Sequence, residues 1–276
     1  MILPPDFPRE IQVVATDYDR TLVWTDSTLH ERTIRALRAT QDAGIHVIVV
    51  TGRMVKSVRQ ALEPAGLDAP VVCYQGAVVA DADGTWLRHE PLPLELARET
   101  IAVLADEGYS PNVYVDDELY VAEDTEAARA YAALNKIDFH VVGDLLEWLD
   151  EPPTKLVAVG APAALDALEP RVKAHFGDRE YISKSLPHFL EFAQAGVTKG
   201  AGLDFLSEHM GFTKERTVAF GDGENDVELV DWPVFGVAVE NAHPRVKAVA
   251  DWVCPPAAEE GVAQVLEALL DLDSTR

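Results

Sequence analysis

Four short polar motifs carry most of the chemistry that this chain could perform. In chain order they are Asp17-Tyr18-Asp19-Arg20-Thr21, Val50-Thr51-Gly52-Arg53, Lys199 and Gly221-Asp222-Gly223-Glu224-Asn225-Asp226. Three of them follow short apolar runs, at 11–15, 47–50 and 218–220, which are typical of buried parallel strands. Ligands bind outside the carboxyl ends of such strands in an open α/β sheet. The sequence therefore predicts one crevice equipped to handle a phosphate together with a divalent cation.

The first motif brings two carboxylates together. Asp17 and Asp19 are two residues apart in an extended segment, so both side chains point the same way. Two like charges this close need a cation, a shared proton or solvent. We interpret the pair as a nucleophile and an acid/base partner around Mg²⁺. A polar turn after a strand stays open at this point, as does the DxD metal site of many glycosyltransferases.

The last motif adds a second cluster of oxygen ligands in a glycine-rich turn. Asp222 lies at the tip of the predicted strand. Asn225 and Asp226 fall on the same side if a helix begins there. Carboxylate and amide oxygens suit Mg²⁺, so together with the first motif the turn predicts a metal site. An acidic loop that supplies helix N-cap residues is the alternative.

The other two motifs could bind an anion. Thr51 and Gly52 fall at a strand-to-helix junction, where backbone N–H groups and a hydroxyl form an anion site. Taken alone, Thr51 is more typical of a simple N-cap. Lys199 follows the predicted N-cap Thr198, in a first helical turn where the macrodipole disfavours a cation. We expect Lys199 to offset a negative charge from elsewhere, the alternative being a solvated surface lysine.

Composition narrows the classes of function. The chain has 276 residues and a net charge of −24, which disfavours binding to nucleic acid or to anionic lipid. An anionic substrate would then need local positive charge from Lys199, Arg53 and a bound metal. Cys73 and Cys254 lie in apolar contexts without a CxxC pair, and no apolar run approaches the roughly 18 residues of a membrane span. We expect a soluble cytoplasmic protein, either a monomer or a homodimer.

The pattern of elements predicts two domains. A βα rhythm occupies 1–90 and returns over 191–276, including a hairpin at 78–87 around Asp83-Gly84. Between them, 91–190 alternates helices and strands without a catalytic motif, although Tyr114, His188 and Phe189 could touch a substrate and Glu191 is more typical of structure. We expect a Rossmann-like, doubly wound α/β core with an inserted α/β cap domain. The predicted helices are 31–43, 94–107, 125–135 and 164–176, and the predicted strands include 45–50, 71–74, 112–115, 119–122, 155–159 and 189–192.

Together the motifs resemble the haloacid dehalogenase superfamily, with DxDxT, a strand-end Thr, a lysine and GDxxND in the expected order. More closely, the chain resembles the Cof-type branch, which has a large α/β cap between the second and third motifs. The resemblance covers nearly the whole chain. It implies a Mg²⁺-dependent phosphatase acting on a small phosphomonoester, such as a sugar phosphate, a nucleotide or a phosphorylated cofactor. A phosphomutase of the phosphomannomutase type and a non-catalytic phospho-ligand binder are the alternatives, whereas a glycosyltransferase would leave Lys199 and Asp222 without a role.

The resemblance also implies a role for each site residue. Asp17 attacks phosphorus and forms an aspartyl-phosphate, and Asp19 protonates the leaving alcohol and then activates water. The catalytic residues are Asp17, Asp19, Thr51 and Lys199. The residues implied for Mg²⁺ are Asp17, the backbone carbonyl of Asp19, and Asp222, with Asp226 and Asn225 steadying the outer shell. The residues implied for substrate are Thr51, Gly52, Arg53, Lys199, Arg20 and Gln75.

Two positions depart from the family pattern. Arg20 stands where glycine is usual, and a left-handed arginine would cost roughly 1–2 kcal/mol. We therefore expect the turn to stay right-handed or mildly strained, with Arg20 free to face the cleft mouth. Gln75-Gly76-Ala77 stands where Asn-Gly-Ala is usual, so a longer amide lies near the cleft and the usual substrate contacts change.

Overall fold

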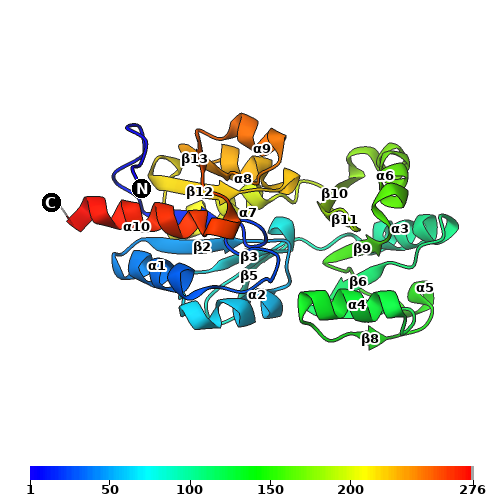
Figure 1. Ribbon diagram of the computed structural model, residues 1–276. Helices are drawn as coiled ribbons and strands as arrows, with labels where there is room; N and C mark the ends of the chain where they lie inside the picture. Colours follow the sequence, from blue (N-terminus) through cyan, green and yellow to red (C-terminus); the bar gives the residue numbers. More distant parts are fainter. Residues whose placement is uncertain (275–276) are drawn as a thin grey trace. The chain divides into compact units, whose positions relative to one another are not determined.

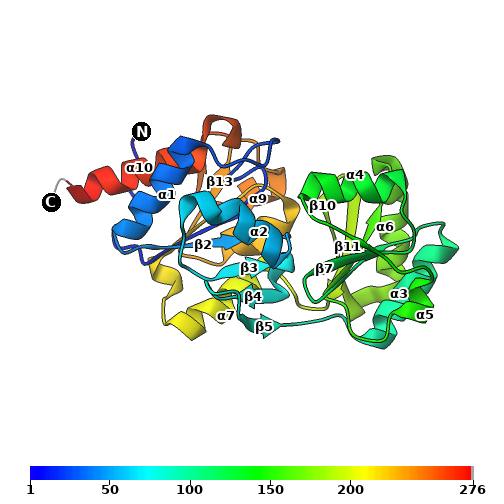
Figure 2. The same cartoon turned by 90° about the horizontal axis from the view of Figure 1, so that it is seen from below.

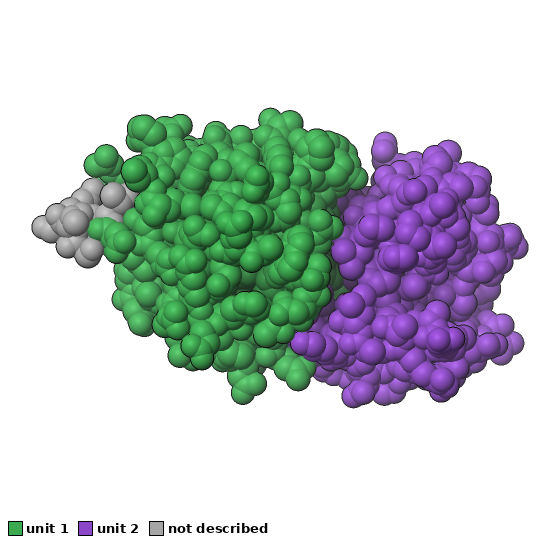
Figure 3. All heavy atoms as spheres, viewed as in Figure 1, with its two compact units in different colours: residues 1–52, 58–87, 198–276 green, residues 53–57, 88–197 purple. Residues whose placement is uncertain are grey.

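The computed structural model describes residues 1–274, which cluster into two compact units (Figure 3). The core unit comprises Met1–Gly52, Val58–Leu87 and Thr198–Arg276, and the inserted unit comprises Arg53–Ser57 and Arg88–Val197. The short segment 53–57 packs with the inserted unit, a grouping that the sequence did not indicate. The domain limits at 90 and 190 stay a prediction. Within residues 1–274, no helix is both long and apolar enough to cross a membrane.

An eight-stranded sheet forms the centre of the core unit, in the order β14-β13-β12-β1-β2-β3-β4-β5 (Figure 1). The strands from β14 to β3 are parallel, and β4 pairs with β3 in the antiparallel sense. The predicted Rossmann-like α/β class is confirmed. The strands are β1 (Val13–Thr16), β2 (His46–Val50), β3 (Val71–Cys73), β4 (Val78–Ala80), β5 (Trp86–His89), β12 (Thr217–Gly221), β13 (Phe235–Val239) and β14 (Trp252–Cys254).

Helices cover both faces of this sheet, because alternate residues of each buried strand point to opposite sides. Val13 and Ala15 of β1 pack with Leu203 and Leu206 of α7 in one apolar cluster. The helices α1 and α10 lie side by side (Figures 1 and 2). The helices wholly within the core unit are α1 (Glu31–Asp42), α7 (Lys199–Met210), α8 (Val227–Asp231), α9 (Pro244–Val249) and α10 (Gly261–Ser274). Helix α2 (Val55–Leu62) begins in the segment 53–57 of the inserted unit and continues in the core unit.

A second sheet, in the order β10-β11-β9-β6-β7-β8, forms the inserted unit. Helices α3 and α6 pack on one of its faces, around buried leucines such as Leu104 and Leu168. The helices and strands predicted for this unit are present to within two residues, but the sequence pattern did not predict β8, β10 or α5. The elements are α3 (Leu94–Asp106), α4 (Glu126–Asn135), α5 (Leu145–Trp148), α6 (Pro162–Phe176), β6 (Asn112–Val115), β7 (Glu118–Val121), β8 (His140–Val141), β9 (Lys155–Val159), β10 (Glu180–Leu186) and β11 (Phe189–Gln194).

Candidate active site

The carboxyl ends of β1 and β12 bring the two acidic motifs together. The N–H of Asp17 donates to the carbonyl of Phe220 at 2.9 Å, so the residues that follow the two strands emerge side by side. Asp17 and Asp222 are both buried there. Asp19 is half-buried and forms a backbone bridge with Val23 in the loop that follows.

Lys199 lies between carboxylates from both motifs. Its ammonium donates to Asp17 Oδ1 at 2.5 Å and to Asp226 Oδ1 at 2.6 Å, and the residue is 1% exposed. Thr198 caps α7 by accepting from the N–H of Ala201 at 3.1 Å, which holds Lys199 in the first turn. Burial alone would lower the pKa of Lys199, but Asp17 and Asp226 raise it, so the side chain stays charged.

Asp226 organises the turn that carries Asp222. Its Oδ2 accepts from the N–H groups of Asp222 and Gly223, both at 2.8 Å, while its Oδ1 accepts from Lys199. An added Cβ at Gly221 would lie 2.6 Å from the Cβ of Asp226, so the turn requires glycine there. Because both oxygens are engaged, we assign Asp226 to holding the turn rather than to binding a metal directly.

The carboxylate group fits a divalent cation. Carboxylate oxygens of Asp17, Asp222 and Asp226 lie within 4.8 Å of one another. Burial, reinforced by Asp226, raises the pKa of Asp17 well above its usual range and that of Asp222 to about 7. The Lys199 ammonium contacts two of these three buried carboxylates, those of Asp17 and Asp226. Hard oxygen donors with a shortage of positive charge suit Mg²⁺. Asp222 Oδ1 accepts from the Thr21 hydroxyl at 3.0 Å and its Oδ2 lies 3.6 Å from Arg20 Nε, so Asp222 is held less tightly than Asp226. Asp17 and Asp222 are therefore the better candidates for metal ligands.

The second motif follows β2 and meets β3. The N–H of Thr51 donates to the carbonyl of Val72 at 2.8 Å, and the carbonyl of Thr51 accepts from the N–H of Gln75 at 3.0 Å. Thr51 is buried, with 1% of its surface exposed. The loop thus lies at the same edge of the sheet as Asp17, since β1 and β2 are parallel neighbours.

The first turn of α2 already binds an anionic side chain. Within the inserted unit, the N–H groups of Val55 and Lys56 donate to the two carboxylate oxygens of Asp117 at 2.8 and 2.7 Å. Asp117 was not among the predicted site residues, although the pair Asp116-Asp117 between two strands is a hairpin-turn signal. The first amides of α2 are thus occupied, so an anion site at this junction would have to come from Thr51 and Gly52.

Arg20 corrects one expectation about the first motif. Its φ is +64°, so the turn is left-handed rather than right-handed. The side-chain amide of Asn241 donates to the Arg20 carbonyl at 2.8 Å and holds this conformation. The guanidinium lies 3.6 Å from Asp222 Oδ2 and 5.9 Å from the centre of the Trp24 ring. Arg20 therefore adds positive charge next to Asp222, one of the three clustered carboxylates.

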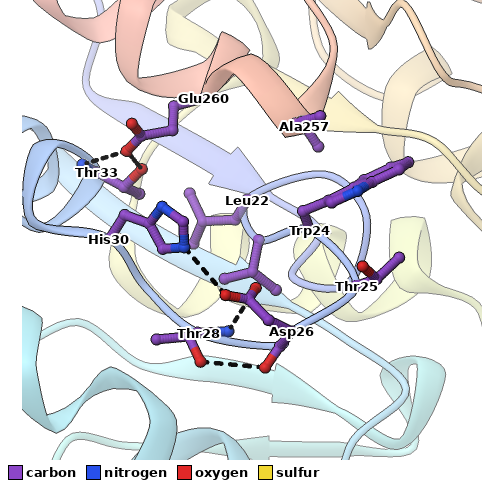
Figure 4. Close-up of a pocket in the computed structure, with 11 residues that line it drawn as sticks. Leu22, Trp24, Thr25, Asp26, Thr28, His30, Thr33, Ala257 and Glu260 are labelled. Atoms are coloured by element: carbon purple, nitrogen blue, oxygen red, sulfur yellow. Dashed lines mark hydrogen bonds and ion pairs between the residues drawn. The ribbon is translucent and has the colours of Figure 1, made fainter.

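A pocket of about 250 Å³ adjoins the loop that begins at Leu22, directly after the first motif (Figure 4). Its charged groups pair with one another or with the backbone. His30 contacts Asp26 at 3.1 Å, and the Glu260 carboxylate accepts from the N–H and hydroxyl of Thr33 at 3.1 and 2.8 Å. The first contact holds the loop to the residue before α1, and the second joins α1 to the residue before α10.

The remaining candidates lie in the inserted unit. The hydroxyls of Tyr114 and Tyr131 are 2.6 Å apart, and Glu191 pairs with Lys155 at 3.1 Å, both partners buried. His188 is exposed, and its Nδ1 lies 3.2 Å from the carbonyl of Gly160. Phe189 packs against Tyr131, and Arg53 belongs to this unit as well. The structure thus places Glu191 in a buried ion pair, in line with the structural role expected of it.

Comparisons with known proteins agree with this arrangement. Residues 14–266 match the model of the haloacid dehalogenase-like hydrolase family. The Bacillus subtilis protein named 5-amino-6-(5-phospho-D-ribitylamino)uracil phosphatase YitU is 30% identical, over 94% of this chain and 98% of its own length. The HMP-PP phosphatase of Klebsiella pneumoniae is 29% identical, over 86% of this chain and 87% of its own.

A crystal structure of a Thermotoga maritima protein superposes with a TM-score of 0.82 at 31% identity, covering 93% of this chain and 97% of that one. Its agreement extends over both the core and inserted units. The family model, the relatives and this structure point to the same assignment. The chain therefore belongs to the haloacid dehalogenase-like hydrolase family, in its Cof-type branch, and is a phosphatase-type enzyme.

Proposed function

We propose that this enzyme is a Mg²⁺-dependent phosphatase that hydrolyses a small phosphomonoester through an aspartyl-phosphate on Asp17. The observation that supports this most is the buried contact of Asp17 with Lys199 at 2.5 Å, next to the carboxylate of Asp222. Burial favours the protonated form of Asp17, which cannot attack, and the ammonium of Lys199 opposes that effect. Lys199 therefore helps to keep the nucleophile ionised.

The reaction that we propose has two balanced steps. In the first, a carboxylate oxygen of Asp17 forms a bond to phosphorus, the ester P–O bond breaks, and Asp19 gives its proton to the leaving alkoxide. In the second, Asp19 takes a proton from water, whose oxygen attacks phosphorus. The bond to Asp17 then breaks and inorganic phosphate leaves.

The other site residues would bind and orient the phosphoryl group. Mg²⁺ held by Asp17, Asp222 and the Asp19 carbonyl would supply positive charge to the phosphoryl oxygens. Thr51 and Gly52 would donate hydrogen bonds, and Lys199 would offset the charge that develops during transfer. Asn225 and Asp226 would hold in place the turn that carries the metal ligand Asp222.

The proposed substrate is a small phosphorylated metabolite. This rests on the named activities of the relatives, which act on a ribityl-substituted uracil phosphate and on HMP-PP. The net charge of −24 does not favour a nucleic-acid substrate. We place the reaction in the cytoplasm, in keeping with two buried cysteine thiols.

Phosphate release from p-nitrophenyl phosphate and from a panel of phosphorylated metabolites tests this function. Release should require Mg²⁺ and should be lost in Asp17→Asn, whose folding is checked by its melting temperature. Undiminished release by Asp17→Asn would reject the aspartyl-phosphate. Interconversion of hexose phosphates with a trace of bisphosphate, without phosphate release, would instead show a phosphomutase.

A further inference from the structure

Gln75 carries a buried side-chain amide donor for which residues 1–274 supply no acceptor. Gln75 lies in the 3-10 turn Tyr74–Gly76 directly after β3, with φ of +60°, and is 2% exposed. Within the described part of the chain, its Nε2 has no hydrogen-bond partner. Burying an unpaired amide costs free energy, and holding glutamine in the left-handed region costs more. Such a cost is typical of a functional position.

The orientation of this amide follows from its other end. Gln75 Oε1 accepts from the side-chain amide of Asn225 at 2.9 Å, a contact between residues 150 positions apart. The two N–H donors of Nε2 must therefore point away from the turn 221–226, which carries Asn225. In that direction lies Gly52, where an added Cβ would be only 2.4 Å from Gln75 Nε2. The donors thus lie against the loop of Thr51 and Gly52.

We propose that Gln75 Nε2 donates a hydrogen bond to an oxygen of the transferred phosphoryl group. The inference rests on the proposed function, in which the loop of Thr51 and Gly52 holds that group. It extends this function by adding a donor from the turn after β3 to those proposed from the loop after β2 and from Lys199 at the start of α7. Gln75 also donates its backbone N–H to the Thr51 carbonyl and accepts from Asn225, so it links the loop of Thr51 and Gly52 to the turn that carries Asp222.

Binding of inorganic phosphate, measured by calorimetry in Mg²⁺, tests the proposal without turnover. Gln75→Met keeps the length of the side chain but removes both donors, and should weaken phosphate binding about tenfold. Gln75→Glu keeps an oxygen for Asn225 but turns a carboxylate toward the phosphate, so binding should weaken further, on the order of a hundredfold. Gln12→Met, the same change at the amino end of β1, should leave the affinity unchanged.

This series separates a phosphate donor from a residue that only positions Asn225. In the second case Gln75→Glu would bind phosphate like the native chain while Gln75→Met would not, and that result overturns the proposal. Equal affinity in all three chains, or no phosphate binding by the native chain, also overturns it. Should Gln75→Met fail to fold, Gln75→Asn replaces it, with weaker binding expected because the shorter amide draws back from Gly52.

A second pair of variants tests the packing on which the inference depends. Gly52→Ala should displace the Gln75 amide, because the new methyl group would lie 2.4 Å from Nε2. The added loss of phosphate affinity from Gly52→Ala should be smaller in a Gln75→Asn background, where the amide is already withdrawn. Strictly additive losses would contradict the contact. Failure of the proposed function would show separately, as turnover that survives Asp17→Asn.

Discussion

Replacing Lys199 with methionine removes the ammonium that joins the two acidic motifs. The new side chain has similar length and no charge, so Asp17 and Asp226 would keep their places but lose a cation at 2.5 and 2.6 Å. Both carboxylates are buried, as is Lys199 at 1% exposure. Water therefore cannot replace the lost partner without rearrangement of the turn.

The size of the effect follows from this burial. Removing one partner from a buried ion pair costs about 3–5 kcal/mol, because the remaining charge stays uncompensated. Lys199 serves two carboxylates, so we expect a loss of stability within this range in metal-free buffer. Millimolar Mg²⁺ should reduce the loss, since Asp17 and Asp222 would then share a cation. Activity should fall roughly 10²–10³-fold, as when one stabilising donor is lost from an active site.

Thermal and urea unfolding, each with EDTA and with Mg²⁺, measure the two effects. Lys155→Met is the matched control, because Lys155 is also buried and pairs with Glu191 at 3.1 Å in the inserted unit. The control should lose several kcal/mol of stability, and Mg²⁺ should not restore it. A loss below about 1 kcal/mol for Lys199→Met, or a loss that Mg²⁺ leaves unchanged, would refute the electrostatic reasoning.

Three further predictions follow from single residues. Burial raises the pKa of Glu180 to about 7, so its contribution to stability is fully present below the unfolded pKa of about 4.3 and is lost as pH rises toward 7. As the pH rises from about 4.3 to about 7, the stability of Glu180→Gln should therefore increase by roughly 3 kcal/mol relative to that of the native chain. Melting temperatures measured across this pH range test this, and curves of melting temperature against pH that run parallel for the two proteins would contradict it. Arg20→Gly should remove the strain of a left-handed arginine, and after loss of the Asp222 contact it should raise stability by up to about 1 kcal/mol. A lower melting temperature would show that the ion pair of Arg20 with Asp222 outweighs the backbone strain. Gly76→Ala should lower both stability and activity, by at least about 2 kcal/mol and tenfold, because an added Cβ would lie 2.1 Å from the Thr198 carbonyl at the start of α7. Native-like unfolding and turnover of that variant would show that the helix yields without moving Lys199.

Much of the fold and of the acidic site could be predicted from local patterns. The apolar runs that end at Ala15, Val50 and Phe220 became parallel strands of one sheet, so the residues after them met at one edge. Lys199 was expected in a first helical turn, and Thr198 does cap α7. These features depend on periodicity and capping, which operate over a few residues and are therefore readable along the chain.

Other features required the register of distant segments. The contact of Gln75 with Asn225, the carboxylate of Asp117 on the first turn of α2, and the left-handed turn at Arg20 held by Asn241 all join parts far apart in sequence. No local pattern encodes such pairs, because each depends on which strands become neighbours and on where each loop leaves the sheet. The sequence could thus name the charged groups of the site, while long-range packing set which of them pair and which donors remain for a ligand.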